Sequence, residues 1–230
     1  MRIKLLTLMM LTLSVLSANA QKPVFGLSMG CNYSNLIGPD KIEESKPRIG
    51  ICPGINVDIP LAYDVYLEIG AYYSQQGVRV VTDEFIRGTT REHYKITKYV
   101  DYLHIPLYWK QSFGDIYTKL GPFASIVIKA QSDWKQEIVY RDSLTTDEGS
   151  YGSFINNLRN YDVGAAFGIG YQTSISRGLD IFFDASYKIG FFSVENKTET
   201  SKRIIRNQFF TFSCGVYFAD KRRSKNYRRH

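Results

Sequence analysis

The sequence predicts an all-β fold, an eight-stranded antiparallel up-and-down transmembrane β-barrel with short periplasmic turns and four longer extracellular loops. Three observations predict it. Period-two alternation of apolar with small or polar residues recurs eight times, short and long gaps alternate between these segments, and the chain opens with an export signal.

The export signal covers residues 1–20. Arg2 and Lys4 precede an apolar stretch from Leu5 to Leu16, and Ala18-Asn19-Ala20 then supplies a small-x-small cleavage site. The apolar stretch is too short to cross a bilayer as a helix, which takes about 20 residues. We therefore expect cleavage after Ala20 and a mature protein, starting at Gln21, in the outer membrane of a Gram-negative bacterium.

In each of the eight segments the apolar side chains share one face. In the first, Phe25, Leu27 and Met29 lie on one face, while glycine and serine alternate with them on the other. At a tilt of about 40°, roughly 10 residues of strand cross an apolar band of ~25 Å, which is the length of these segments. The predicted strands cover residues 25–33, 49–59, 67–74, 103–110, 116–128, 161–172, 180–189 and 210–218.

The second face of the strands combines small residues with scattered charges. A soluble β-sandwich or a lipocalin-like barrel is the alternative, but it would place its bulky residues inside. A narrow lumen filled by small residues and compensating charges explains the pattern better, and eight strands leave no room for an open channel. We expect structural pairing of acids with lysines in this lumen, among Asp58, Glu68, Asp162, Asp184, Lys110, Lys119 and Lys188.

The gaps between strands alternate in length as they do in outer-membrane barrels. Long gaps span residues 34–47, 81–98, 131–157 and 192–205, and short ones span 60–64, 112–115 and 174–178. With an even strand count, both ends of the barrel then lie in the periplasm and the long loops face outward. Aromatic residues near strand ends fit the girdles at the two interfaces, among them Tyr33, Tyr73, Tyr99, Trp109, Tyr161 and Tyr171.

The net positive charge of the chain comes from the residues that follow Asp220. The formal net charge is +7, but six of the positive residues follow Asp220, and residues 21–220 are nearly neutral. The predicted barrel covers residues 21–218, and residues 219–230 form a basic periplasmic tail. A nucleic-acid-binding face would need basic residues spread over a folded surface, so no nucleic acid is expected as a partner. The tail is either simply solvated or contacts an anionic partner or lipid headgroups.

Cysteine and histidine residues point to no metal site and no cofactor. Cys31, Cys52 and Cys214 are widely spaced, unlike zinc ligands, and are interpreted as fillers of the wall or lumen. His104 alternates into the lumen as a hydrogen-bonded filler. No catalytic residue is assigned. The remaining candidate is a lipid-modifying enzyme in which His93 acts with Ser74 and either Asp83 or Glu84, although nothing in their spacing brings them together.

Several segments resemble the PorT-like outer-membrane β-barrel proteins. They are Gly26 to Leu36, Ile69 to Gly77, Leu103 to Leu107 with its Leu-His-Ile-Pro-Leu sequence, Gly121-Pro122-Phe123, and the glycine-rich Gly164 to Gly170. The resemblance covers nearly the whole mature chain and implies architecture and location rather than an activity. Barrels of this type often end on an aromatic residue, whereas this chain continues for twelve residues past Phe218.

The leading functional hypothesis is a non-enzymatic barrel with a structural or interaction role. It would contact outer-membrane lipids through its wall and ligands or other envelope proteins through its outer loops, chiefly residues 131–157, because recognition usually resides in loops on a rigid scaffold. The alternative, suggested by the family name, is a component of a protein secretion apparatus that docks through residues 219–230. The lipid-modifying enzyme is the third hypothesis.

Overall fold

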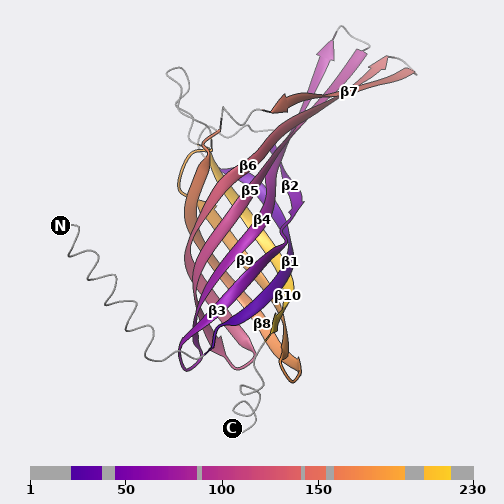
Figure 1. The fold of residues 1–230 in the computed structure, drawn as a ribbon. Coiled ribbons are helices and arrows are strands. Elements are labelled where there is room, and N and C mark those ends of the chain that lie inside the picture. Colours follow the sequence, from indigo (N-terminus) through magenta and orange to yellow (C-terminus); the bar gives the residue numbers. More distant parts are fainter. Residues whose placement is uncertain are drawn as a thin grey trace, which may run out of the picture.

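The strands of the protein close into a barrel (Figure 1). The structure is a computed structural model in which residues 22–37, 45–86, 90–140, 143–153, 158–194 and 205–218 are described. The export signal and the basic tail therefore lie outside the described residues. The strands are β1 (Val24–Ile37), β2 (Ser45–Ile51), β3 (Gly54–Ala62), β4 (Val65–Ile86), β5 (Thr90–Phe113), β6 (Ile116–Tyr140), β7 (Ser143–Ser153), β8 (Tyr161–Ser176), β9 (Leu179–Gly190) and β10 (Arg206–Phe218).

Nine of these ten strands form the ring and fill eight positions in it, as predicted. The segments β2 and β3 both lie between β1 and β4 and act as one strand, while β7 pairs only with β6 outside the ring. The other neighbours pair antiparallel in chain order, and β10 pairs with β1 from Phe25 opposite Phe218 to Ile37 opposite Arg206. This last pairing closes the barrel and leaves no open edge in its wall.

The second predicted strand, 49–59, is interrupted where it was expected to be continuous. The break falls at Cys52 and Pro53, and proline has no N–H to donate to a ladder. The segment nevertheless stays in the wall, because Gly30 and Cys52 exchange backbone hydrogen bonds of 3.1 and 2.8 Å, and Tyr73 N donates to the carbonyl of Pro53 at 2.9 Å. The alternation of faces continues through the break.

The apolar face of each strand lies on the outside of the barrel, as the sequence predicts. Neighbouring residues on β6 illustrate this, since Leu120 is 59% exposed while Lys119 is 6% exposed. Of the predicted girdle residues, Tyr33, Trp109, Tyr161 and Tyr171 are exposed outside, whereas Tyr73 and Tyr99 are half-buried. No helix in the described ranges is long and apolar enough to span a membrane.

One end of the barrel, here called the turn end, carries the three short connections. They centre on Tyr63-Asp64, Gly114-Asp115 and Arg177-Gly178, which confirms the predicted short turns. The backbone is left-handed at Asp64 (φ 57°), Gly114 (φ 68°) and Gly178 (φ 95°), which is the conformation that tight hairpins require.

At the opposite end, two segments predicted as loops are strands instead. Residues 81–98 belong to a hairpin in which β4 runs to Ile86 and β5 starts at Thr90, and within 131–157 β6 runs to Tyr140 and pairs with β7. These parts of β4, β5, β6 and β7 form a sheet, here called the extension, that rises beyond the barrel (Figure 1). The gap predicted at 34–47 narrows to 38–44, which lies outside the described residues, as do most of residues 192–205.

Candidate functional site

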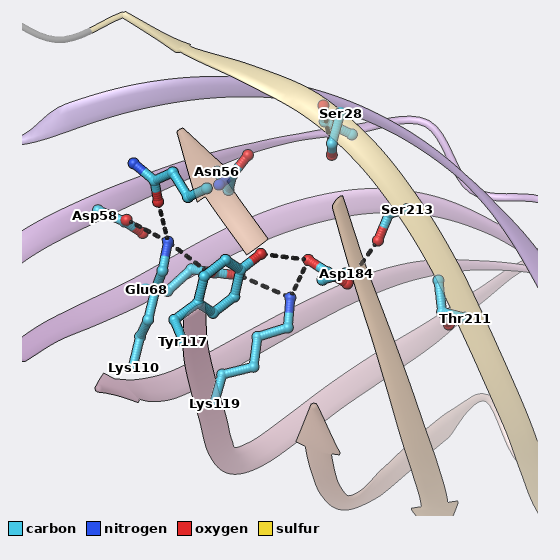
Figure 2. A network of polar contacts seen from close by, with 12 residues as sticks. Ser28, Asn56, Asp58, Glu68, Lys110, Tyr117, Lys119, Asp184, Thr211 and Ser213 are labelled. Atoms are coloured by element: carbon cyan, nitrogen blue, oxygen red, sulfur yellow. Dashed lines mark hydrogen bonds and ion pairs between the residues drawn. The ribbon is translucent and has the colours of Figure 1, made fainter. Parts of the chain in front are cut away.

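A chain of alternating acids and lysines crosses the lumen. The Lys110 ammonium lies 2.8 Å from Asp58 and 4.0 Å from Glu68, and the Lys119 ammonium lies 3.6 Å from Glu68 and 2.7 Å from Asp184. The five residues come from five different strands, β3, β4, β5, β6 and β9, and all are buried. Figure 2 shows the two lysines reaching between the three carboxylates. Glu68 is therefore the link between two ion pairs.

Uncharged side chains complete the hydrogen bonding of this chain. Asp184 accepts from the Tyr117 hydroxyl at 3.1 Å and from the Ser213 hydroxyl at 2.8 Å. Lys110 donates to Gln172 Oε1 at 3.1 Å and to the Tyr217 hydroxyl at 3.2 Å. Buried charges are tolerated when their remaining hydrogen-bonding positions are satisfied, which these neighbours achieve.

Apolar and aromatic side chains fill the lumen on both sides of the charged chain. Toward the turn end lie Val24, Tyr117, Phe182 and Tyr217. A second cluster contains Tyr108, Phe123, Ala166 and Phe209. A third, closer to the extension, contains Val100, Tyr102, Val127, Ala130 and Leu158. Successive levels of the interior are thus occupied by side chains, as expected for eight strands.

His104 lies in the second of these levels. Its Nδ1 is 2.8 Å from the Ser125 hydroxyl, and its ring centroid is 4.8 Å from that of Phe123 and 5.8 Å from that of Phe209. The predicted role of a hydrogen-bonded filler is confirmed. The Nε2 atom is buried without a partner among the described residues.

Two of the predicted lumen charges do not join an ion pair. Lys188 donates to Thr211 at 3.1 Å, and Asp162 accepts from Asn207 at 3.3 Å, with no ion pair for either within the described residues. Thr211 in turn donates to Asn32 at 2.8 Å. The prediction of ion pairing was wrong for these two residues, because the side chains next to them in the lumen are neutral polar ones. Their charges alone do not reveal such partners in the sequence.

Ser74 lies far from the other residues of the enzyme hypothesis. Ser74 is buried in the lumen, where its hydroxyl accepts from Asn32 at 2.9 Å. On the backbone, Ser74 lies opposite Tyr102, whereas His93 lies opposite Asp83 in the extension. Nine residues of strand separate the two positions, which is about 30 Å. The side chains of Asp83, Glu84 and His93 lie outside the described part of the chain, but the backbone alone separates Ser74 from His93.

The three cysteines occupy the two faces of the wall. Cys31 and Cys214 are exposed on the outside, Cys52 is buried inside, and all three are free. This confirms their interpretation as wall or lumen fillers. The interior residues that sequence reasoning missed are Asn32, Tyr117, Gln172, Thr211, Ser213 and Tyr217. Their place on the inward face was predictable, but their partners were not.

A closed barrel with an apolar outer face and a filled, charged interior defines a β-barrel membrane protein. The family model described as outer membrane protein beta-barrel domain matches residues 19–196, more than half of the chain. The chain belongs to this family, and is an outer-membrane β-barrel protein of a Gram-negative bacterium. No curated protein matches the chain in sequence.

Comparison with solved structures finds several outer-membrane proteins. Ail, the attachment invasion locus protein of Yersinia pestis, is matched at 11% identity and a TM-score of 0.35, covering 86% of this chain and 100% of Ail. Neisserial surface protein A is matched at 10% identity and a TM-score of 0.36, covering 86% and 99%. The outer membrane protease OmpT from Escherichia coli is matched at 8% identity and a TM-score of 0.31, covering 86% and 95%.

Proposed function

We propose that this protein is a non-enzymatic, non-conducting barrel that holds the extension outside the cell for contact with ligands or neighbouring envelope proteins. The observation that carries the proposal is the combination of a filled lumen with a sheet that continues four strands beyond the barrel wall. A filled interior offers no path for solutes. The contact surface is then the part of the chain that leaves the wall, chiefly residues 131–157, together with 34–47, 81–98 and 192–205.

The orientation follows the general plan of outer-membrane barrels, which have short turns in the periplasm and longer connections outside. The turn end would then face the periplasm and the extension would face outward. Cleavage after Ala20 and a periplasmic position for residues 219–230 belong to the same proposal.

Antibody labelling of two tagged variants tests the orientation. One variant carries an epitope between Tyr140 and Ser143, at the tip of the β6–β7 hairpin, and the other carries it after His230. We expect the first epitope to be labelled on intact cells and the second only after the outer membrane is permeabilised. The reverse pattern would overturn the proposed topology.

Conductance in planar bilayers tests the closed lumen. The purified barrel should insert without regular current steps, while a large-pore porin in the same bilayer serves as the positive control. A variant in which Lys110 and Lys119 are both alanine removes the cross-lumen pairs and two side chains that fill the lumen. The fraction of this variant that folds, selected by its heat-modifiable gel mobility, should conduct more than the wild type. Regular steps from the wild type would contradict the proposal.

A second candidate is a component of a protein secretion apparatus. Two sequence observations favour it, namely the resemblance to PorT-like proteins and the six basic residues that follow Asp220. A basic tail attracts anionic partners or headgroups, with about 1 kcal/mol for each charge near an anionic surface. Deleting residues 219–230 should then impair cargo secretion while the barrel still inserts. Unchanged secretion with normal insertion would remove this candidate.

A further inference from the structure

A polar pocket lies on the extension, outside the barrel. Its volume is about 460 Å³, within the ~300–1,000 Å³ range of small-molecule sites. Residues from three adjacent strands line it: Lys95, Thr97 and Tyr99 of β5, Asp133, Trp134 and Lys135 of β6, and Glu148 and Gly149 of β7. The same residues are neighbours in the sheet, since Lys95 lies opposite Lys135, Lys135 opposite Glu148, and Thr97 opposite Asp133.

The pocket opens on the same face as the outer surface of the barrel. Along β5, Leu103 and Ile105 face outward. Because side chains alternate strictly along a strand, Asp101, Tyr99, Thr97 and Lys95 lie on the same outward face. The alternation on β5 is not interrupted, because the extra residue at the local bulge belongs to β6. Asp101 is opposite Lys129 and Tyr102 is opposite Val127. The pocket thus continues the outer wall of the barrel rather than its lumen.

A change from apolar to polar residues marks the edge of the membrane on this wall. Outward residues are apolar up to Leu103 on β5 and Ile128 on β6, and beyond them lie Asp101 and Lys129. Asp101 accepts a hydrogen bond of 2.6 Å from Tyr73, an outward residue of β4. Tyr99 is two residues beyond this border and Lys95 six, so at the strand tilt of about 40° the pocket spans heights of roughly 5–15 Å above it. The end of the pocket nearest the barrel therefore lies at the depth of the lipid headgroups.

The lining chemistry fits a hydroxylated ligand. Two ammonium groups and two hydroxyls can donate hydrogen bonds, and two carboxylates can only accept them. Lys135 is held 2.7 Å from Glu137, while Lys95 faces Lys135 directly, an arrangement of like charges that is unfavourable unless acceptors lie between them. The lining includes two aromatic residues. Tyr99 is covered on one face by Arg48, whose guanidinium lies 4.3 Å from the ring centroid, and Trp134 has its ring centroid 6.2 Å from that of Tyr151.

We propose that this pocket binds a saccharide, supplied by the headgroup of a glycolipid in the surrounding outer leaflet. Sugar hydroxyls donate to Asp133 and Glu148 and accept from Lys95, Thr97 and Tyr99. The source of the sugar rests on the proposed function, which places the extension outside the cell, while the chemistry of the pocket does not depend on orientation.

Calorimetric titration of the detergent-solubilised protein tests the pocket. The probe is the lipid-free oligosaccharide released by mild acid from the lipopolysaccharide of the same outer membrane. We expect saturable binding that is about tenfold weaker in the double variant Asp133→Asn, Glu148→Gln, because charge-assisted hydrogen bonds are roughly twice as strong as neutral ones. The control is Asp147→Asn, an exposed β7 residue that does not line the pocket. Absence of saturable binding, or equal affinity of wild type and double variant, would overturn the pocket assignment.

A second arm tests the source of the saccharide. The protein is reconstituted into nanodiscs with or without intact lipopolysaccharide, and the same oligosaccharide is titrated. If neighbouring glycolipids fill the pocket, their presence should weaken the apparent affinity for the free oligosaccharide at least severalfold, whereas equal affinities would overturn the glycolipid source. Epitope labelling tests the orientation of the barrel independently of these titrations. A wrong orientation would therefore show in the labelling, and a wrong pocket assignment would show in the calorimetry.

Discussion

Lys119 bonds to carboxylates from two other strands, and neither of its partners is a neighbour in sequence. It contacts Asp184 of β9 at 2.7 Å and Glu68 of β4 at 3.6 Å. The sequence shows that all three face the lumen, because period-two alternation assigns a side to every residue. It does not show which charges meet, since that depends on the relative register of strands that are not adjacent in the sheet. For this reason the sequence predicts ion pairs for Asp162 and for Lys188 that the described part of the structure does not contain.

Replacing Lys119 with methionine should destabilise the barrel by about 3–5 kcal/mol, because Glu68 and Asp184 would lose a buried partner. Urea unfolding in lipid vesicles, followed by tryptophan fluorescence, measures the change. Lys129→Met is the matched control, since Lys129 is exposed on the same strand. Equal unfolding midpoints for wild type and Lys119→Met would show that the charged chain contributes little to stability.

The sequence predicts loops where the structure has the strands of the extension. Alternation is visible where one face of a strand is apolar, as in residues 103–110, which border lipid on one side and the lumen on the other. Beyond Val100, which still packs in the lumen, both faces of β5 meet a polar environment, and residues such as Thr97, Lys98 and Tyr99 carry no period-two contrast. The backbone pairing continues regardless of this loss of pattern. The hairpins could therefore not be recognised from hydropathy, although the positions of the turns could.

Gly77 lies where β4 enters the extension and has a backbone conformation that a residue with a Cβ would adopt only under strain. Its φ is +140°, and a Cβ added there would lie 2.1 Å from the carbonyl oxygen of Lys98. Gly77→Ala should therefore loosen the extension while the barrel stays closed. Limited chymotrypsin digestion should cut within residues 81–98 faster in this variant, whereas Arg79→Ala, on the same strand, should resemble the wild type. Unchanged digestion of Gly77→Ala would contradict this account.

At the scale of the whole molecule, the outer belt of apolar side chains decides where the protein resides. The predicted strands and their faces were confirmed around the entire ring, because the lipid-facing contrast that produces them is the strongest pattern in the sequence. The sequence only disfavours a soluble barrel, and the outward position of these residues in the structure is the opposite of what a soluble barrel, which would bury them, requires.

Phe183 provides a test of the belt. It is 54% exposed on the outside of β9, next to the buried Phe182. Phe183→Arg should cost roughly 2–4 kcal/mol of folding free energy in a bilayer, the range for arginine near the midplane of a barrel. Thr146→Arg, exposed on β7 in the extension, should cost nothing measurable. Urea titration in vesicles compares the two, and a neutral effect at Phe183 would place this position outside the lipid layer.

The closing pair of strands constrains how the protein is made. Among the strands of the wall, residues 25–37 are synthesised first and residues 206–218 last, yet they are direct neighbours. Until the final strand has been translocated, the first has an unsatisfied edge and the ring cannot seal. A truncated polypeptide therefore has no finished form to adopt, and the cell must keep the growing precursor from self-association until biogenesis is complete.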